Sequence, residues 1–253
     1  MNVVISFDDG RYDNENACDI LKKLNLKATL FVTTGFIDKT WIKPQSWQSV
    51  DKPMTIEYLK RLNSNFEIAS HTDTHSYDNE NVIISIQKLH TMGFTNVCGL
   101  SIPNSSINDR QLLNDEVKLR ELGIRYVRVG RNKKCYSFFY KLLYLGYRVF
   151  KIQFCYDLFN SININMNNTF LYYSLVIKRN DNVKFIENFL KKTMNKHPNA
   201  TVVLMFHSIL KKGDRLYKKD KWSYDEKSFI KLCHFLCNSK KITVKTLKEV
   251  VDS

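Results

Sequence analysis

Glycine and proline are scarce in this chain, which has 8 glycines and 4 prolines among 253 residues. No glycine-, proline- or serine-rich stretch, low-complexity tract or internal repeat divides the sequence, so no segment has the composition of an interdomain linker. The length suits one α/β barrel or two small domains, and either can bury a proper core. Without a linker, we predict a single domain over residues 1–253.

The cysteines lack the spacing of a metal or disulfide framework. There are six, and they form no CxxC pair and no crowded cluster, which argues against a zinc ribbon and against a small disulfide scaffold. We expect most of them to be buried thiols in a reducing compartment. They are Cys18, Cys98, Cys135, Cys155, Cys233 and Cys237.

Export and membrane-spanning signals are also missing from the sequence. Met1 and Asn2 lead straight into an apolar run, with no basic region, long apolar region or small-residue cleavage site before it. No stretch approaches the roughly 20 apolar residues of a membrane helix. We therefore expect a cytoplasmic protein. The basic balance and the aromatic stretch 138–150 would suit a weak association with the inner membrane face, although a packed core explains that stretch equally well.

Basic residues exceed acidic ones, with 39 Lys and Arg against 25 Asp and Glu. This balance favours anionic partners. The lysines are nevertheless scattered through the sequence and belong to no recognisable nucleic-acid-binding motif. We expect no nucleic-acid partner. The competing hypothesis, a basic nucleic-acid-binding protein, would require an affinity for oligonucleotides that falls steeply with salt.

Strand-like and helix-like segments alternate along the chain, which predicts a parallel sheet. So many units favour a distorted (β/α) barrel of about seven parallel strands over an open sheet. The pattern blurs through residues 135–154, where we expect one helix and one strand. The expected strands are 3–7, 28–33, 66–70, 97–102, 124–129, 169–177 and 201–206; the expected helices are 14–24, 55–63, 82–92, 110–122, 183–195 and 229–237.

Titratable residues follow three of these strands directly. Asp8 and Asp9 follow the run 3–7, HTDTH begins at His71 after strand 66–70, and His207 follows strand 201–206. In a (β/α) barrel the chemistry gathers at the carboxyl ends of the strands. We therefore expect these side chains to meet at one rim.

A carboxylate with two imidazoles is a standard ligand set for a divalent ion such as zinc. In HTDTH, His71 and His75 are four residues apart and would share a face if the chain turns helical there. A second carboxylate next to the first can take the proton of a metal-activated water that attacks a carbonyl. Asp8 and Asp9 alone would be explained by a turn; the histidines favour a metal site.

In this order, SFDDG, HTDTH and LMFH resemble the first, second and fifth motifs of the NodB-homology polysaccharide deacetylases, carbohydrate esterase family four. The similarity runs from residue 3 to the carboxyl-terminal helices. It implies a distorted (β/α) barrel, a divalent metal, usually zinc with cobalt or nickel sometimes accepted, and hydrolysis of an acetamido or acetyl group on a sugar. It further implies Asp8 as general base, Asp9, His71 and His75 as metal ligands, and His207 as general acid.

The middle motifs depart from the family pattern. The family's third motif is Arg-x-Pro-Tyr, and the corresponding stretch here is SIPNSS, with Ser101 in place of the arginine. Pro103 is retained, and the Asn104 amide would help to bind the oxyanion. Arg128, in YVRVG at the end of the next strand, is our candidate to replace the missing guanidinium. The fourth motif, an Asp and a Trp that support the acid, has only a poor candidate in Asp157.

Aromatic side chains on loops at the same rim could stack on sugar faces, although a tryptophan on a loop is as often a hydrophobic plug. Those selected are Trp41, Trp47 and Trp222. Because no export signal is present, we expect an N-acetylated sugar, nucleotide- or lipid-linked, as substrate. The alternatives are a non-catalytic glycan-binding relative that retains the metal, and an amidase acting on a non-sugar C–N bond. N- versus O-acetyl preference, native metal and oligomeric state stay open.

Overall fold

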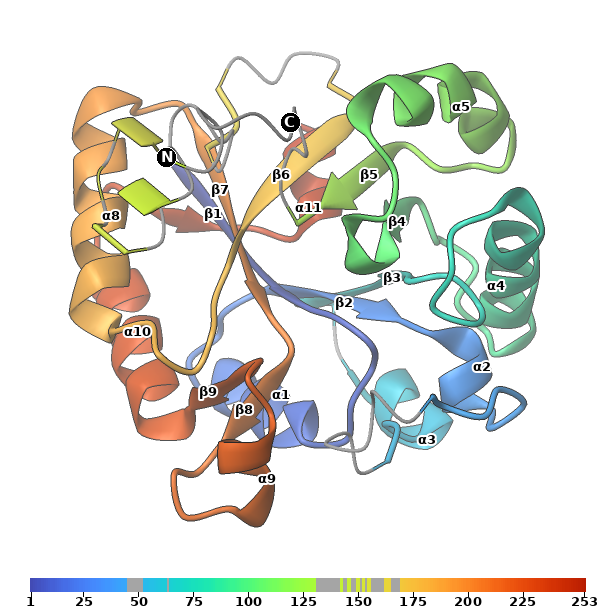
Figure 1. Cartoon of the computed structure of the whole chain (residues 1–253), viewed down its shortest axis with the longest axis horizontal. Helices are drawn as coiled ribbons and strands as arrows, with labels where there is room; N and C mark the ends of the chain where they lie inside the picture. Colours follow the sequence, from blue (N-terminus) through green and yellow to red (C-terminus); the bar gives the residue numbers. More distant parts are fainter. Residues whose placement is uncertain are drawn as a thin grey trace.

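Seven parallel strands close into a distorted barrel among the residues that the structure describes (Figure 1). The computed structural model describes residues 1–44, 52–62, 64–130, 142, 145–146, 149–150, 152, 154–155, 162–164 and 169–253. Strand β7 pairs with β1 from Asn2↔Thr201 to Phe7↔Phe206, which closes the ring and confirms the predicted barrel. The strands are β1 (Asn2–Phe7), β2 (Ala28–Val32), β3 (Phe66–Ser70), β4 (Gly99–Ser101), β5 (Tyr126–Val129), β6 (Leu171–Val176) and β7 (Thr201–Phe206).

The helices lie around the outside of the strands, as Figure 1 shows. Side-chain caps begin the helices at Asp78, Asn108 and Asn182, each of which accepts a backbone N–H from the first turn. No helix in the described part of the chain is long and apolar enough to cross a membrane. The principal helices are α1 (Asn14–Lys23), α2 (Thr34–Ile37), α3 (Ile56–Lys60), α4 (Asn79–Thr91), α5 (Asp109–Glu121), α8 (Val183–Lys196) and α10 (Glu226–Asn238).

Most predicted elements lie within a few residues of those observed, and the exceptions are short. The helix expected over 55–63 is only α3, capped by Thr55, and the strand expected over 97–102 is only β4. Elements this short that lie outside the regular alternation of strands and helices carry too little periodicity to be predicted. Those missed include β8 (Ser208–Leu210), α9 (Arg215–Lys219), β9 (Ser223–Asp225), β10 (Thr243–Val244) and α11 (Leu247–Val251). The helix and strand expected within 135–154 lie largely outside the described residues.

Alternate residues of each strand face the barrel interior. In β1, Val4 packs in the inner cluster, whereas Val3 and Ile5 pack against the surrounding helices. The inner cluster takes one residue from each of six strands: Val4, Phe31, Ala69, Tyr126, Tyr172 and Val203. Because side chains alternate with period two, the inward positions beyond this layer fall at the strands' carboxyl ends. These positions are Asp8, His71, Arg128 and His207.

The amino-terminal end of the barrel is closed by α11. Leu247 and Val250 pack into the inner cluster, and β10 pairs with the first residues of β1. Glu67 is buried above this plug and accepts hydrogen bonds from Tyr126 Oη at 2.7 Å and from the Lys248 backbone N–H at 2.9 Å. Gly99 faces the same tyrosine so closely that a Cβ would lie 2.1 Å from its oxygen. This end is packed, so the carboxyl-terminal rim is left for chemistry.

Candidate metal centre

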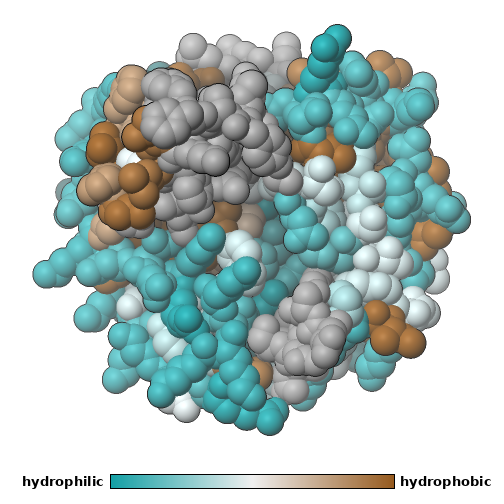
Figure 2. All heavy atoms as spheres, viewed as in Figure 1, coloured by the Kyte–Doolittle hydropathy of each residue, from teal (hydrophilic) through white to brown (hydrophobic). Residues whose placement is uncertain are grey.

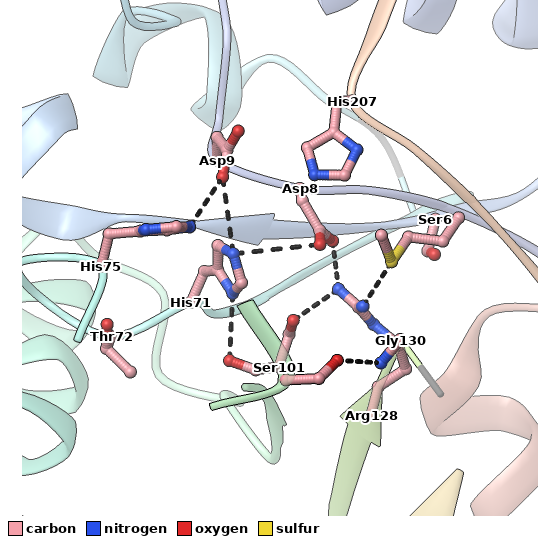
Figure 3. A network of polar contacts seen from close by, with 12 residues as sticks. Ser6, Asp8, Asp9, His71, Thr72, His75, Ser101, Arg128, Gly130 and His207 are labelled. Atoms are coloured by element: carbon pink, nitrogen blue, oxygen red, sulfur yellow. Dashed lines mark hydrogen bonds and ion pairs between the residues drawn. The ribbon is translucent and has the colours of Figure 1, made fainter. Parts of the chain in front are cut away.

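Asp9, His71 and His75 converge at the carboxyl-terminal rim (Figure 3). One ligand atom from each side chain lies within 4.8 Å of the other two. Asp9 Oδ1 is 3.4 Å from His71 Nε2 and 3.4 Å from His75 Nε2. The two imidazole rings meet edge to face, with centroids 5.0 Å apart. The predicted ligands therefore lie together, from β1 and from the loop after β3.

The donor atoms of this cluster fit a divalent cation. Asp9 Oδ1 is buried without a hydrogen-bond partner, a costly arrangement unless a cation satisfies it. The Nδ1–H of His71 donates to the Ser101 carbonyl at 3.0 Å, and this leaves Nε2 unprotonated toward the cluster. Burial lowers the pKa of His75, which favours the neutral imidazole that a metal needs.

Strained backbone, and not a helix, brings the two histidines together. The residues from His71 to Tyr77 form a loop with a bend at 73–75, and α4 begins only at Asn79, so the expected helical face is wrong. Asp9, Thr72 and His75 have φ values of 75°, 67° and 53°, in the left-handed region that non-glycine residues rarely adopt. Such strain concentrates at functional sites.

Asp8 lies beside this cluster and is paired with Arg128. Nη2 of Arg128 donates to Asp8 Oδ1 and also contacts Ser101 Oγ, while the Arg128 guanidinium lies 4.8 Å from the Phe31 ring centroid. Asp8 Oδ2 is 3.8 Å from His71 Nε2. Burial alone would raise the pKa of Asp8, but the Arg128 cation and the neighbouring histidines lower it below its usual value. A guanidinium from β5 thus reaches Asp8, the predicted base.

Arg11 is a second buried arginine of the centre, which the sequence interpretation missed. Its Nε donates to Asp9 Oδ2 at 2.7 Å, and its Nη1 donates to Asp220 Oδ2 at 2.7 Å and to Ser208 Oγ at 2.9 Å. Although burial opposes it, the Arg11 guanidinium holds the pKa of Asp9 well below its usual value. Oδ2 is occupied by this pair, so Oδ1 is the oxygen turned toward the histidines. The only sequence signal was position, directly after SFDDG.

Arg11→Lys should weaken metal binding about 10- to 100-fold, the usual cost of disturbing a group that orients a metal ligand. Lysine keeps the charge but loses the planar fork that holds Asp9 Oδ2. Competition with a chromogenic zinc chelator measures the change. The matched control is Arg120→Lys, which alters an exposed arginine–carboxylate pair with Glu116 on α5. Equal zinc affinities in the wild type and Arg11→Lys would contradict the role assigned to Arg11.

His207 lies close to Asp8 in Figure 3, and it is not part of the Asp9, His71 and His75 cluster. Burial lowers the pKa of His207 to about 4, while Asp9 and Asp8 act in the opposite direction. The imidazole is therefore neutral at rest, which differs from the cationic acid that amide cleavage requires. Its Nδ1 is buried without a hydrogen-bond partner. The Trp222 ring packs against it, with centroids 5.0 Å apart.

An aspartate and a tryptophan, the pair expected from the family's fourth motif, do lie beside His207. From the sequence, the only candidate for this motif was Asp157. Asp220 is buried, binds Arg11, and accepts the backbone N–H of Trp222 at 2.8 Å through Oδ1. Its charge acts to raise the pKa of His207. Both residues follow His207 in the chain, in the segment between β8 and β9. Asp157 lies outside the described residues.

The remaining predicted residues border the centre to different degrees. Trp41 stacks on His75, with ring centroids 6.4 Å apart, so it forms part of the wall of the metal cluster. Pro103 is buried in a short 3₁₀ turn (Pro103–Ser105) after β4, and Asn104 is exposed there with φ of 55°. The structure does not show the Asn104 N–H against the metal ligands. Trp47 lies outside the described residues.

Residues 1–114 match the family model described as polysaccharide deacetylase. This stretch carries Asp8, Asp9, His71 and His75. The match covers less than half of the chain, and over this part it confirms the resemblance of the motifs to the polysaccharide deacetylases. A search of curated protein sequences finds no significant match. The family implies a hydrolase acting on acetyl groups of a glycan, and the substrate itself is not established.

Solved structures share the barrel fold with this chain. A Mycobacterium smegmatis protein assigned to the polysaccharide deacetylases aligns over 99% of this chain and 88% of its own, with 11% identity and a TM-score of 0.58. A 4-alpha-glucanotransferase from Thermococcus litoralis aligns over 100% of this chain and 40% of its own, with 13% identity and a TM-score of 0.60. At these identities the likeness concerns the fold alone.

A Streptococcus pyogenes deacetylase, solved in complex with acetate, is 22% identical over 49% of this chain, with a TM-score of 0.39. The alignment covers 53% of that protein. The chain therefore spans about half of the Streptococcus pyogenes deacetylase and less than half of the glucanotransferase.

Proposed function

We propose that this chain is a metal-dependent hydrolase that removes the N-acetyl group from an N-acetylated sugar in a glycan or glycan precursor and releases acetate. The observation that carries the proposal is the buried, unpartnered Asp9 Oδ1 between two imidazole nitrogens, with an ionised carboxylate beside them. The match of residues 1–114 to the polysaccharide deacetylase model supports the acetyl group as the target. Zinc is the cation we propose, with cobalt or nickel as substitutes, because one carboxylate and two imidazoles suit these ions.

Asp9, His71 and His75 would hold the cation, which supplies a Lewis acid for the acetyl carbonyl and makes a water molecule more acidic. Asp8 would accept the proton of the attacking water, since its pairing with Arg128 keeps it ionised and oriented. The Asn104 N–H is our candidate donor to the developing oxyanion. Pro103 fixes the turn that carries it, and Trp41 and Trp222 would border the sugar.

His207 would donate a proton to the departing amine. Because burial keeps its imidazole neutral at rest, His207 must gain that proton during the reaction. The nearby carboxylates Asp8 and Asp9, whose charges act to raise the pKa of His207, favour this gain. A neutral resting imidazole is less of an obstacle to ester cleavage than to amide cleavage, because an amine leaves poorly unless it is protonated. This observation favours a second candidate activity, removal of an O-acetyl group from a sugar.

The substrate that we propose is a nucleotide- or lipid-linked saccharide in the cytoplasm. A lipid-linked saccharide would be reached at the inner membrane face. A non-catalytic glycan-binding relative is the alternative if the base lacks a supporting cation. Arg128 supplies a guanidinium to Asp8, and this pair supports a working base. An amidase acting on a non-sugar C–N bond would use the same groups, and the substrate panel below separates it from a sugar deacetylase.

Acetate release tests the proposal across free, nucleotide-linked, lipid-linked and polymeric N-acetylhexosamines, an O-acetylated xylan and simple non-sugar acetamides. We expect release from at least one N-acetylated sugar, loss of release after treatment with dipicolinate, and recovery when zinc, cobalt or nickel is restored. Release from the xylan alone would select the ester activity, and release from non-sugar acetamides alone would select the amidase. A zinc-loaded protein that releases no acetate from any substrate would contradict catalysis.

A further inference from the structure

A group of basic side chains lies at the barrel rim next to His207. Six of the eleven residues from 211 to 221 are Lys or Arg, against 39 in the 253 residues of the chain. Two more follow β6, in the loop that packs against this segment. Figure 2 shows hydrophilic side chains gathered over α9 and the adjoining strands. We call this group the basic rim; it consists of Lys178, Arg179, Lys211, Lys212, Arg215, Lys218, Lys219 and Lys221.

Hydrogen bonds from Arg179 to backbone carbonyls connect the two segments of the basic rim. The Arg179 side chain donates to the carbonyl oxygens of Tyr217 and Lys218, and its backbone N–H donates to the Lys221 carbonyl at 3.4 Å. These segments follow β6 and β7, so they leave the barrel at the end that carries the metal ligands. The basic charges therefore belong to the face on which the proposed reaction occurs.

Trp222 connects the basic rim to the catalytic groups. The centroid of the Trp222 ring is 5.0 Å from that of His207. The ammonium groups of Lys178 and Lys221 lie 4.5 Å and 5.3 Å from the same Trp222 centroid. The Trp222 backbone N–H is fixed by Asp220, which is itself paired with Arg11. A ligand at His207 therefore has two cations within reach beyond the tryptophan.

Acidic side chains are few in the 211–221 segment of the basic rim, whereas Asp181 lies beside Lys178 in the other segment and accepts its backbone N–H at 2.8 Å. Of the two carboxylates within residues 211–221, Asp220 is paired with Arg11, and Asp214 accepts the N–H of Leu216 as the cap of α9. Within the described part of the chain, five exposed lysines of the rim make no ion pair: Lys211, Lys212, Lys218, Lys219 and Lys221. Like charges repel one another, and a group of one sign beside a cleft attracts ligands of the other sign.

We propose that the substrate of this site is an N-acetylated sugar carrying a phosphate, and that Lys178 and Lys221, backed by the rest of the basic rim, bind that phosphate. The inference rests on the proposed function, because the acetamide must lie at the metal centre for the phosphate to reach Trp222. Phosphate is favoured over a neutral polymer because ammonium groups gathered at one rim gain most from a compact dianion. A sugar 1-phosphate, a nucleotide diphosphate and a lipid diphosphate share this chemistry.

The test compares the wild type with Lys178→Gln/Lys221→Gln on four substrates: N-acetylglucosamine 1-phosphate, its nucleotide-linked and short lipid-linked diphosphates, and neutral chitobiose. We expect the double variant to raise KM about tenfold or more for the phosphorylated sugars, as loss of charge-assisted contacts would. KM for chitobiose should change much less. The lowest KM among the three phosphorylated sugars identifies the source of the phosphate.

The matched control is Lys192→Gln/Lys231→Gln, which removes two exposed lysines from α8 and α10 and makes the same change in net charge. An equal loss in this control would assign the effect to overall charge and would overturn the subsite. Wild-type protein with equal KM for phosphorylated and neutral sugars would also overturn it, while the deacetylase function would stand. A third outcome would also overturn the subsite: the protein binds anionic vesicles through Lys178 and Lys221, but its KM for phosphorylated sugars does not change when these lysines are replaced.

Calorimetry with N-acetylglucosamine 1-phosphate and zinc-loaded protein separates the subsite from catalysis. Binding to the wild type that is at least tenfold weaker in the double variant supports the subsite even if no acetate is released. Absence of acetate release from every substrate, with this binding intact, would overturn the proposed function alone.

Discussion

Replacing His71 by alanine should abolish both the binding of the metal and acetate release. His71 Nε2 is one of the three donor atoms within 4.8 Å of one another, and its Nδ1–H is already committed to the Ser101 carbonyl. Among the described residues, no other His, Cys, Asp or Glu side chain joins this cluster. Without His71, a bound cation would keep only Asp9 and His75 as protein ligands. Zinc content by mass spectrometry of the native protein and acetate release measure the two effects.

The control for this prediction is His90→Ala, which removes an exposed imidazole from α4. That variant should bind one zinc ion with wild-type affinity and keep its activity. Full zinc occupancy in His71→Ala would refute the ligand set. Restored zinc binding on addition of free imidazole would support it, because the ligand removed is an imidazole in a buried position.

Asp8→Asn should retain the metal and lose roughly two to four powers of ten in kcat, the usual contribution of a positioned general base. The asparagine oxygen can still accept the hydrogen bond from Arg128, but the amide cannot take a proton from water. Single-turnover acetate release with zinc-saturated enzyme measures the loss. A matched change at a buried carboxylate that does not belong to the ligand cluster, Asp225→Asn at the cap of α10, should leave kcat nearly unchanged.

The pH dependence of kcat/KM tests how Asp8 is held ionised. In the wild type the Arg128 cation lowers the pKa of Asp8, so activity should not fall through protonation of Asp8 until the pH is below the ordinary carboxyl range. Arg128→Met removes that cation while burial, which raises the pKa, remains. The acid limb of kcat/KM should therefore move to higher pH. An unmoved limb would mean that Arg128 does not set the charge of Asp8.

The inward-facing part of the site was predictable because the strands alternate with period two. In β7, for example, Val203 and Met205 face inward, and the next inward position is His207. The same counting from Tyr126 in β5 gives Arg128, which was selected from the sequence only for its place at the end of that strand. Regular strands thus carry their geometry in the spacing of residues.

The part of the site that lies on loops was not predictable in the same way. His75 reaches the cluster through left-handed backbone at Thr72 and at His75 itself, and no pattern of polar and apolar residues encodes such a turn. Arg11 and Asp220 are 209 positions apart, and their ion pair depends on how the segment after β7 folds back. Long-range pairs of this kind become visible only in the folded chain.

Arg128 lies one strand away from the place where the family usually carries its arginine, and its guanidinium still meets the same aspartate. A closed ring of strands points many side chains at one small volume, so a required charge can be supplied from more than one direction. Searches that demand each motif at a fixed position would class such a chain as inactive. For proteins of this architecture, catalytic competence is better judged by which groups surround the base in space than by which motifs are intact.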